Sequence, residues 1–238
     1  MDDFTFYGDL LGIASAYRLG AQAAYQKLDA FYNTVFGRLE PLCRQPKRHI
    51  HVQMFSDSLV VWGKGAKEIL EHLQNVYLDL IGKNLLLRGA IVTGALEKGP
   101  RLEAMHFRKF LPTNDTLARA VGLEKTVKGA RLLIEPQLAG RLLAKQPEWL
   151  TVEGYFENVH AQVPQSDMLR RICPTPSGTS HELLYFWKTN GVAGDAADEP
   201  TIAERLKELA EFHDPFVAEH LRETSKLLRR STLRARHE

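Results

Sequence analysis

Two strand-like segments joined by a very short polar turn constrain this chain more than any other feature of its sequence. Residues 49–55 (HIHVQMF) alternate between apolar and other side chains, which is the pattern of a half-buried strand. After Ser56-Asp57-Ser58 comes the apolar run of residues 59–62 (LVVW). Because so short a connection joins antiparallel neighbours, the sequence predicts a β-hairpin with Asp57 in its turn.

The segments on either side of this hairpin define the fold class. Strands are predicted over residues 4–9 and 85–93, and amphipathic helices over about 12–39 and 66–81. The resulting order is βαββαβ. It predicts an α+β domain, an α/β sandwich, whose ferredoxin-like sheet carries both helices on one face.

The rest of the chain is less regular. Its patterns predict a loop over 98–112, helices over 114–128 and 137–144, and strands over 131–134 and 181–187. Residues 191–200 (GVAGDAADEP) have the composition of a linker before a long terminal helix that starts at residue 201. We therefore expect a domain over residues 1–190. Residues 191–238 would be a linker and helical extension that packs on that domain or on a partner subunit.

Bulk composition excludes several classes of protein. The chain has 238 residues, 31 Lys and Arg against 29 Asp and Glu, and two cysteines. A net charge of +2 gives no field that would attract nucleic acid or a membrane surface. Two cysteines cannot form a disulfide framework, and neither a basic leader nor an apolar span is apparent. We expect a cytoplasmic protein.

Asp9 and Asp57 are the strongest candidates for function. In the predicted sheet, the end of the first strand lies beside the hairpin turn, so the two carboxylates would be neighbours. Singly, an Asp after a strand is commonly a helix N-cap and an Asp in a hairpin is a turn residue. Together, at these two places, they favour a site for Mg²⁺ or Mn²⁺, two ions per site, beside a triphosphate.

A phosphate-binding turn is predicted next to the first aspartate. Gly12 permits close approach of the backbone, and the amides that follow, at the start of a helix, attract an anion. The predicted phosphate contacts are Gly12, Ile13, Ala14 and Ser15. We expect the Leu10 carbonyl to join Asp9 and Asp57 as a metal ligand.

These motifs resemble the catalytic domain of class III nucleotidyl cyclases. FYGDLLGIA resembles the family's first metal motif, and MFSDSLVVW the second, with Ser56 in the place of the usual Gly. LLLRGAIVTGAL resembles the R-x-G-I-x-x-G signature of the strand that follows: Arg88, Ile91 and Gly94 are in place, and the first Gly is moved by one place to Gly89. The resemblance covers residues 4–140, and it implies cyclisation of a nucleoside triphosphate.

The chain departs from the family at the residues that stabilise the transition state. Ala118 and Gly122 stand where the family has Asn and Arg, and neither can donate a hydrogen bond from its side chain. Another basic residue must replace them if the protein is catalytic. The candidates for this role are Arg119, Arg131 and the loop residues Arg108 and Lys109. Arg119 is our choice for the catalytic residue, and we expect Arg108 and Lys109 to contact the substrate.

A second departure concerns the base. Four residues before the hairpin Asp, adenylate cyclases have Lys and guanylate cyclases have Glu, whereas this chain has Gln53. The departures and the segments DLLG, FSDS and ARAVGLEK resemble the divergent bacterial cyclases of Pycsar anti-phage systems. That resemblance implies a homodimer with sites at the subunit interface, a product of cyclic UMP or cyclic CMP, and a separate effector protein.

Two other functions compete with this one. The missing Asn and Arg are also what a catalytically inactive, cyclase-like nucleotide sensor would show. A palm-type polymerase or a diguanylate cyclase would share the metal chemistry, but the chain has no Gly-Gly-(Asp/Glu)-Glu-Phe hairpin.

Overall fold

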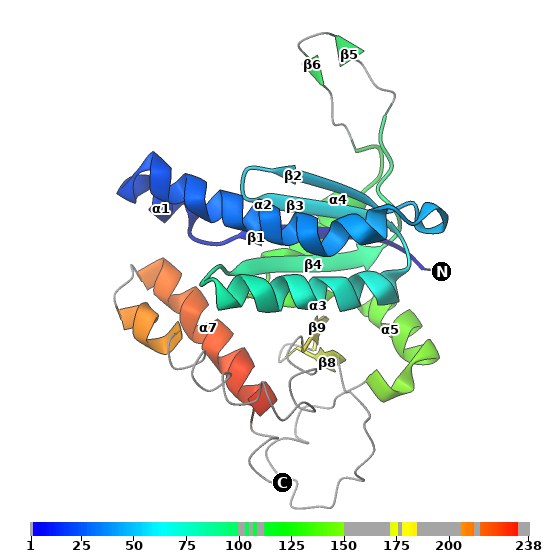
Figure 1. The fold of residues 1–238 in the computed structure, drawn as a ribbon. Helices are drawn as coiled ribbons and strands as arrows, with labels where there is room; N and C mark the ends of the chain where they lie inside the picture. The colour runs from blue at the N-terminus through cyan, green and yellow to red at the C-terminus, as the bar shows by residue number, and fades with distance from the viewer. Residues whose placement is uncertain are drawn as a thin grey trace, which may run out of the picture.

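The centre of the protein is a seven-stranded mixed sheet with the strand order β2-β3-β1-β4-β7-β9-β8 (Figure 1). The computed structural model describes residues 2–99, 103–104, 107–108, 112–149, 172–175, 178–184, 206–211 and 215–232. The strands of the sheet are β1 (Asp3–Leu10), β2 (His51–Phe55), β3 (Ser58–Lys64), β4 (Leu87–Thr93), β7 (Leu132–Ile134), β8 (Ile172–Pro174) and β9 (His181–Leu183).

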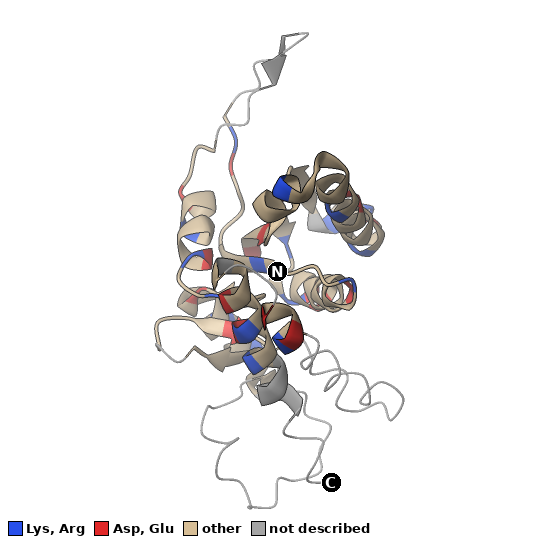
Figure 2. Ribbon diagram, turned by 90° about the vertical axis from the view of Figure 1, so that its left-hand side faces the viewer, with Lys and Arg blue, Asp and Glu red and all other residues tan. Residues whose placement is uncertain are grey.

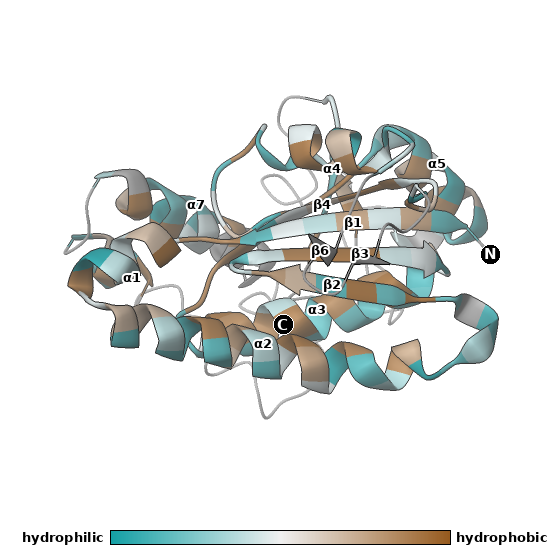
Figure 3. Ribbon diagram, turned by 90° about the horizontal axis from the view of Figure 1, so that it is seen from above, coloured by the Kyte–Doolittle hydropathy of each residue, from teal (hydrophilic) through white to brown (hydrophobic). Residues whose placement is uncertain are grey.

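Helices cover both faces of this sheet. They are α1 (Ile13–Leu19), α2 (Ala21–Cys43), α3 (Ala66–Gly82), α4 (Thr116–Glu124), α5 (Pro136–Lys145) and α7 (Pro215–Thr232), with 3-10 turns η1 (Pro46–Arg48) and η2 (Pro147–Trp149). Helices α2 and α3 lie on one face, and α4 packs over β1 and β4 on the other (Figure 3). The α+β class and the βαββαβ order with both helices on one face are confirmed.

Strand β1 lies between β3 and β4 and pairs antiparallel with both of them. Phe4 and Phe6 of this strand are fully buried in the core beneath α2 and α3. Gly89 of β4 lies over the Phe6 ring, and a Cβ atom there would stand 2.7 Å from the ring carbons. Side chains at positions 5, 7 and 9 therefore project to the opposite face of the sheet.

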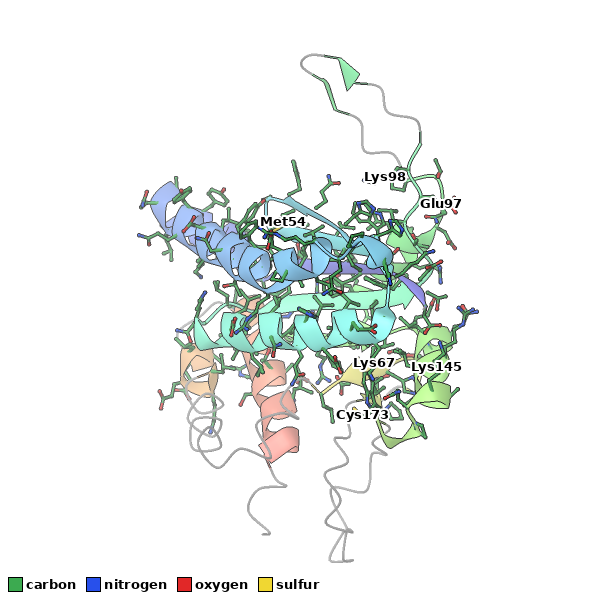
Figure 4. The ribbon with its side chains drawn as sticks, turned by 45° about the vertical axis from the view of Figure 1, so that its right-hand side comes forward. Met54, Lys67, Glu97, Lys98, Lys145 and Cys173 are labelled. Atoms are coloured by element: carbon green, nitrogen blue, oxygen red, sulfur yellow. The ribbon has the colours of Figure 1, made fainter. Side chains whose placement is uncertain are left out.

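The same alternation orients strand β2. Val52 and Met54 pack against the core, and Figure 4 shows Met54 between β2 and α2. Gln53 and Phe55 consequently face the other side, as the alternating pattern predicted. Phe55 is 78% exposed there.

Two elements differ from the sequence prediction. The single helix expected over residues 12–39 is broken into α1 and α2 at Gly20, whose φ of 140° and ψ of 153° are open to glycine and not to other residues. The segment expected to be a loop over 98–112 contains β5 (Glu103–Ala104) and β6 (Phe107–Arg108), which pair antiparallel and form an arm beyond the sheet.

The C-terminal part is only partly within the described residues. Residues 206–211 and α7 are helical, in agreement with the predicted terminal helix, and α7 packs on the same chain. The strand predicted over 181–187 is β9 in its described part. The predicted linker 191–200 lies outside the described residues, so the boundary near residue 190 stays a prediction.

Charges on the described elements are interspersed and do not divide the molecule into acidic and basic faces (Figure 2). Among the described residues, no helix has the length and hydropathy needed to cross a membrane.

Candidate active site

Backbone pairing brings the two aspartates together. In the ladders, Asp9 stands opposite Ser58 of β3 and Arg88 of β4. The amide of Leu10 donates a hydrogen bond to the carbonyl of Asp57 at 2.8 Å. The hairpin turn is thereby fixed to the end of β1, and both carboxylates lie at the same end of the sheet.

A pocket of about 300 Å³ opens at this end. Seven consecutive residues from the end of β1 and the start of α1 line it, together with a further residue of α1 and three residues from distant parts of the chain. The lining residues are Asp9, Leu10, Leu11, Gly12, Ile13, Ala14, Ser15, Arg18, Asp57, Arg88 and Val217. Every residue predicted to hold metal or to cradle phosphate through its backbone is therefore at one pocket.

Two backbone positions give this pocket its shape. Gly12 adopts φ 83° and ψ 11° immediately before α1, a left-handed conformation that glycine adopts at little cost. Ser56 has φ 52° in the hairpin turn. A residue with a Cβ atom is strained at this φ, and the cyclase motif that the segment resembles has Gly at the place of Ser56.

Asp9 lies where a negative charge is costly. Burial first, and then the neighbouring carboxylates of Asp57 and Glu124, raise the pKa of its carboxyl to about 6, while Arg88 and the hydrogen bond from Ser58 oppose the rise. A carboxylate that is costly to ionise gains most from a cation that neutralises it.

The oxygen donors of the pocket suit Mg²⁺ or Mn²⁺. Two carboxylates are hard oxygen ligands, and these ions commonly keep water and phosphate oxygens for their remaining positions. The carbonyl of Leu10 projects to the same strand edge as its amide, which faces Asp57. Among the described residues, no group of three or more His, Cys, Asp and Glu side chains is placed to hold a metal, so any ion here would rely on substrate oxygens as well.

Two hydroxyl groups form a chain of contacts that ends on Asp9. Ser58 Oγ donates to Asp9 Oδ1 at 3.5 Å, and the Tyr7 hydroxyl lies 3.2 Å from the same Ser58 oxygen. Burial is the main cause that raises the pKa of Tyr7, with Ser58 opposing it. The phenol therefore stays protonated at neutral pH and can donate to Ser58.

The sequence prediction missed two arginines that line the pocket. Arg88 is largely buried and paired with the buried carboxylate of Glu124, and its Nη1 donates to the Val127 carbonyl at 3.5 Å. Its place in the R-x-G-I pattern is the sequence signal that marks it. Arg18 is exposed on α1, one helical turn beyond Ala14, and the four-residue spacing could have identified it.

Arg119 does not line this pocket. It pairs with Glu135, and its Nη2 donates to the Thr93 carbonyl at 2.7 Å. Thr93 ends β4 five residues after Arg88, which is roughly 17 Å along the strand. Arg119 thus lies at the opposite end of the sheet from Asp9, and a catalytic role would need a pocket on a second subunit.

Gln53 and Arg131 also lie away from the pocket, whereas the other predicted contacts fall outside the described residues wholly or in their side chains. Gln53 is on the open face of β2, opposite Val60. Arg108 is in β6, outside the sheet, and its side chain is outside the described part of the structure, as is the whole of Lys109. Arg131 is buried and paired with Glu182 and Glu223, which suits a structural role.

Comparison with solved structures finds cyclase domains. Adenylyl cyclase CyaB from P. aeruginosa is 17% identical, with a TM-score of 0.47, over 60% of this chain and 81% of that one. The guanylate cyclase domain of RhGC from Catenaria anguillulae, in complex with GTP, is 15% identical, with a TM-score of 0.43, over 61% and 84%. A class III adenylyl cyclase-like ATP-binding protein from Pseudomonas aeruginosa is 14% identical, with a TM-score of 0.46, over 59% and 34%.

No protein-family model matches this chain, and no curated protein matches it. At these identities and TM-scores the structural likenesses carry no argument about activity. The function proposed below depends on the residues of the pocket.

The charge on Asp9 predicts an unusual effect of Asp9→Asn on stability without metal. Because the folded-state pKa is raised, the wild type loses stability as pH rises from about 4 to about 6. With EDTA at pH 7.5, Asp9→Asn should therefore be more stable than the wild type by about 1–2 kcal/mol once solvent screening of this partly exposed carboxylate is allowed for, and the gain should vanish near pH 4. Urea unfolding at both pH values measures this.

Mn²⁺ should reverse the order, since it stabilises only the protein that binds it. Asp29→Asn, at an exposed position of α2, is the matched control and should follow the wild type in both conditions. If the free energy of unfolding depended on pH in the same way in the wild type and in Asp9→Asn, the raised pKa assigned to Asp9 would be wrong.

Proposed function

We propose that the protein is a nucleotidyl cyclase. It would convert UTP or CTP to the 3′,5′-cyclic nucleotide and pyrophosphate, as a second messenger of anti-phage defence in the cytoplasm. The observation that carries this proposal is the joint placement of Asp9 and Asp57 with Arg18 and Arg88 in one pocket. Two acids suited to divalent ions, beside two guanidinium groups suited to phosphate, match the charge pattern of a metal–triphosphate complex.

In the proposed reaction, the ribose 3′ oxygen attacks the α-phosphorus of the same nucleotide. The bond from that phosphorus to the oxygen that bridges to the β-phosphate breaks, pyrophosphate leaves with its electron pair, and the hydroxyl proton passes to solvent. Asp9, Asp57 and the Leu10 carbonyl would hold two divalent ions. Such ions lower the pKa of the hydroxyl and neutralise charge on the phosphates.

The residues of the chain would position the substrate. Arg88 is fixed by Glu124 and can present its remaining donors to a phosphate without a search through rotamers. The backbone amides from Gly12 to Ser15 would hold other phosphate oxygens, as the sequence predicted. Arg18, exposed at the mouth of the pocket, adds a second positive charge.

The proposal includes a homodimer, because one chain does not gather all the predicted parts. Gln53 and Arg119 do not reach the pocket of their own subunit. The face of the sheet that carries Gln53 continues from Asp9 through Ser58 to Phe55, whose exposed ring could be covered by a second copy. In that arrangement the partner would supply base recognition through Gln53 and the transition-state donor through Arg119.

Base preference rests on Gln53. A neutral amide offers both a donor and an acceptor, which the Lys or Glu of purine cyclases does not. The choice of a pyrimidine is supported by this residue and by the sequence resemblance. The role in phage defence, with a separate effector protein, is supported by the resemblance. The rival proposal is a catalytically inactive nucleotide sensor, favoured by Ala118 and Gly122 at the places of the transition-state residues.

Incubation with Mn²⁺ and each of the four ribonucleoside triphosphates should yield a cyclic product and an equal amount of pyrophosphate from UTP or CTP. Asp57→Asn keeps the shape of the turn and removes the charge, so turnover should fall at least about a hundredfold. Product analysis by chromatography and mass spectrometry checks both statements. Tight binding of one triphosphate without a product would favour the sensor, and full turnover by Asp57→Asn would contradict the metal assignment.

Mixing two inactive variants tests the shared site. Asp57→Ala and Arg119→Gln should each be nearly inactive, while an equal mixture should recover about a quarter of wild-type activity. Half of randomly mixed dimers pair the two variants, and one of the two sites in such a dimer is intact. A mixture no more active than its components would contradict a site made from both subunits.

A further inference from the structure

The C-terminal helix α7 reaches the pocket. Val217, in the first turn of α7, lines it together with Asp9 and Asp57, although more than 150 residues separate it from either one in sequence. Figures 1 and 3 both place α7 beside the end of the sheet where α1 begins. The helix predicted as a C-terminal extension is therefore part of the pocket wall.

Buried hydrogen bonds hold α7 in this position. His220 Nδ1 accepts from the amide of Gly129 at 3.0 Å, and Thr224 Oγ1 accepts from the amide of Ala130 at 2.8 Å. Thr224 also donates to the His220 carbonyl at 2.8 Å. These contacts satisfy two backbone amides that would otherwise be buried without partners, so moving α7 away would be costly.

Close packing reinforces these bonds. Gly129 has φ 89°, and a Cβ atom there would lie 3.0 Å from the backbone nitrogen of Thr224. Glu223 of the same helix accepts a hydrogen bond from Arg131 at 3.4 Å. The backbone of α7 thus approaches the loop before β7 as closely as a glycine allows.

The segment that holds α7 also holds Arg88, one of the two arginines of the pocket. Arg88 contacts Glu124 and the Val127 carbonyl, only two residues before Gly129. Burial, followed by the charges of Arg88 and Lys128, lowers the pKa of His220 to about 4. The ring is therefore neutral at neutral pH, as an accepting Nδ1 requires.

We propose that α7 is a fixed wall of the triphosphate site and that Val217 is a positioning residue, whose size limits the space beside the phosphates. This rests on the proposed function only in so far as a triphosphate occupies the pocket. Val217 is half-buried and has no hydrogen-bonding group in its side chain. Its methyl groups exclude water from one side of the pocket without competing for the metal or for the arginines.

The test uses the full chain and inorganic triphosphate with Mn²⁺, measured by calorimetry, so that neither base recognition nor turnover enters. Val217→Trp fills the pocket and should weaken binding by about tenfold or more. Val217→Thr keeps the volume and should bind within about threefold of the wild type. Arg222→Trp adds the same ring at an exposed position of α7 and should bind as the wild type does.

Thermal unfolding of each variant separates loss of binding from loss of fold. If Val217→Trp does not fold, Val217→Leu replaces it and should bind more weakly than Val217→Thr. Wild-type affinity in the enlarged variant would overturn the role of Val217 and leave the proposed function intact. A wild-type protein that binds neither inorganic triphosphate nor any nucleoside triphosphate would overturn both.

Discussion

The antiparallel pairing of β1 with both β3 and β4 is the constraint on which the rest of the site depends. This pairing places Asp9 opposite Ser58 and Arg88. Beyond the last pair of β1 and β3, the Leu10 amide donates a hydrogen bond to the Asp57 carbonyl. A shift of one residue in either ladder would turn Asp9 into the core under α2 and α3, since side chains alternate between faces. The buried Phe4 and Phe6 resist such a shift, so the apolar core fixes the acidic site.

Charge balance links this geometry to chemistry. Asp9, Asp57 and Glu124 place three carboxylates at one end of the sheet, and Arg88, which is paired with Glu124, partly compensates them. Burial, and then the neighbouring carboxylates, raise the pKa of Asp9, so a negative charge on Asp9 is costly. A divalent ion would correct this, and Arg18 and Arg88 would then face the anion that accompanies it. We therefore propose that the pocket takes a metal and a polyanion together, in an active cyclase and in an inactive sensor alike.

Much of this arrangement could be predicted because local patterns determine it. Alternation in residues 49–55 and the short turn at Asp57 define the hairpin, and the helix after Gly12 follows from its apolar periodicity. The break at Gly20 could not be predicted, because it depends on the backbone angles that this one glycine adopts in the folded chain. Val217 could not be predicted, because its place depends on long-range packing of α7 against the loop at Gly129, which leaves no periodic signal in the sequence.

The central claim is that Asp9 and Asp57 bind divalent ions beside a triphosphate. Crystals grown with Mn²⁺ and a UTP or CTP analogue that lacks the 3′ hydroxyl test it directly, through anomalous scattering from manganese. We expect an anomalous peak bonded to carboxylate oxygens of both Asp9 and Asp57, with the triphosphate in the same pocket near Arg88. Manganese bound elsewhere, or a triphosphate seated outside this pocket, would contradict the account.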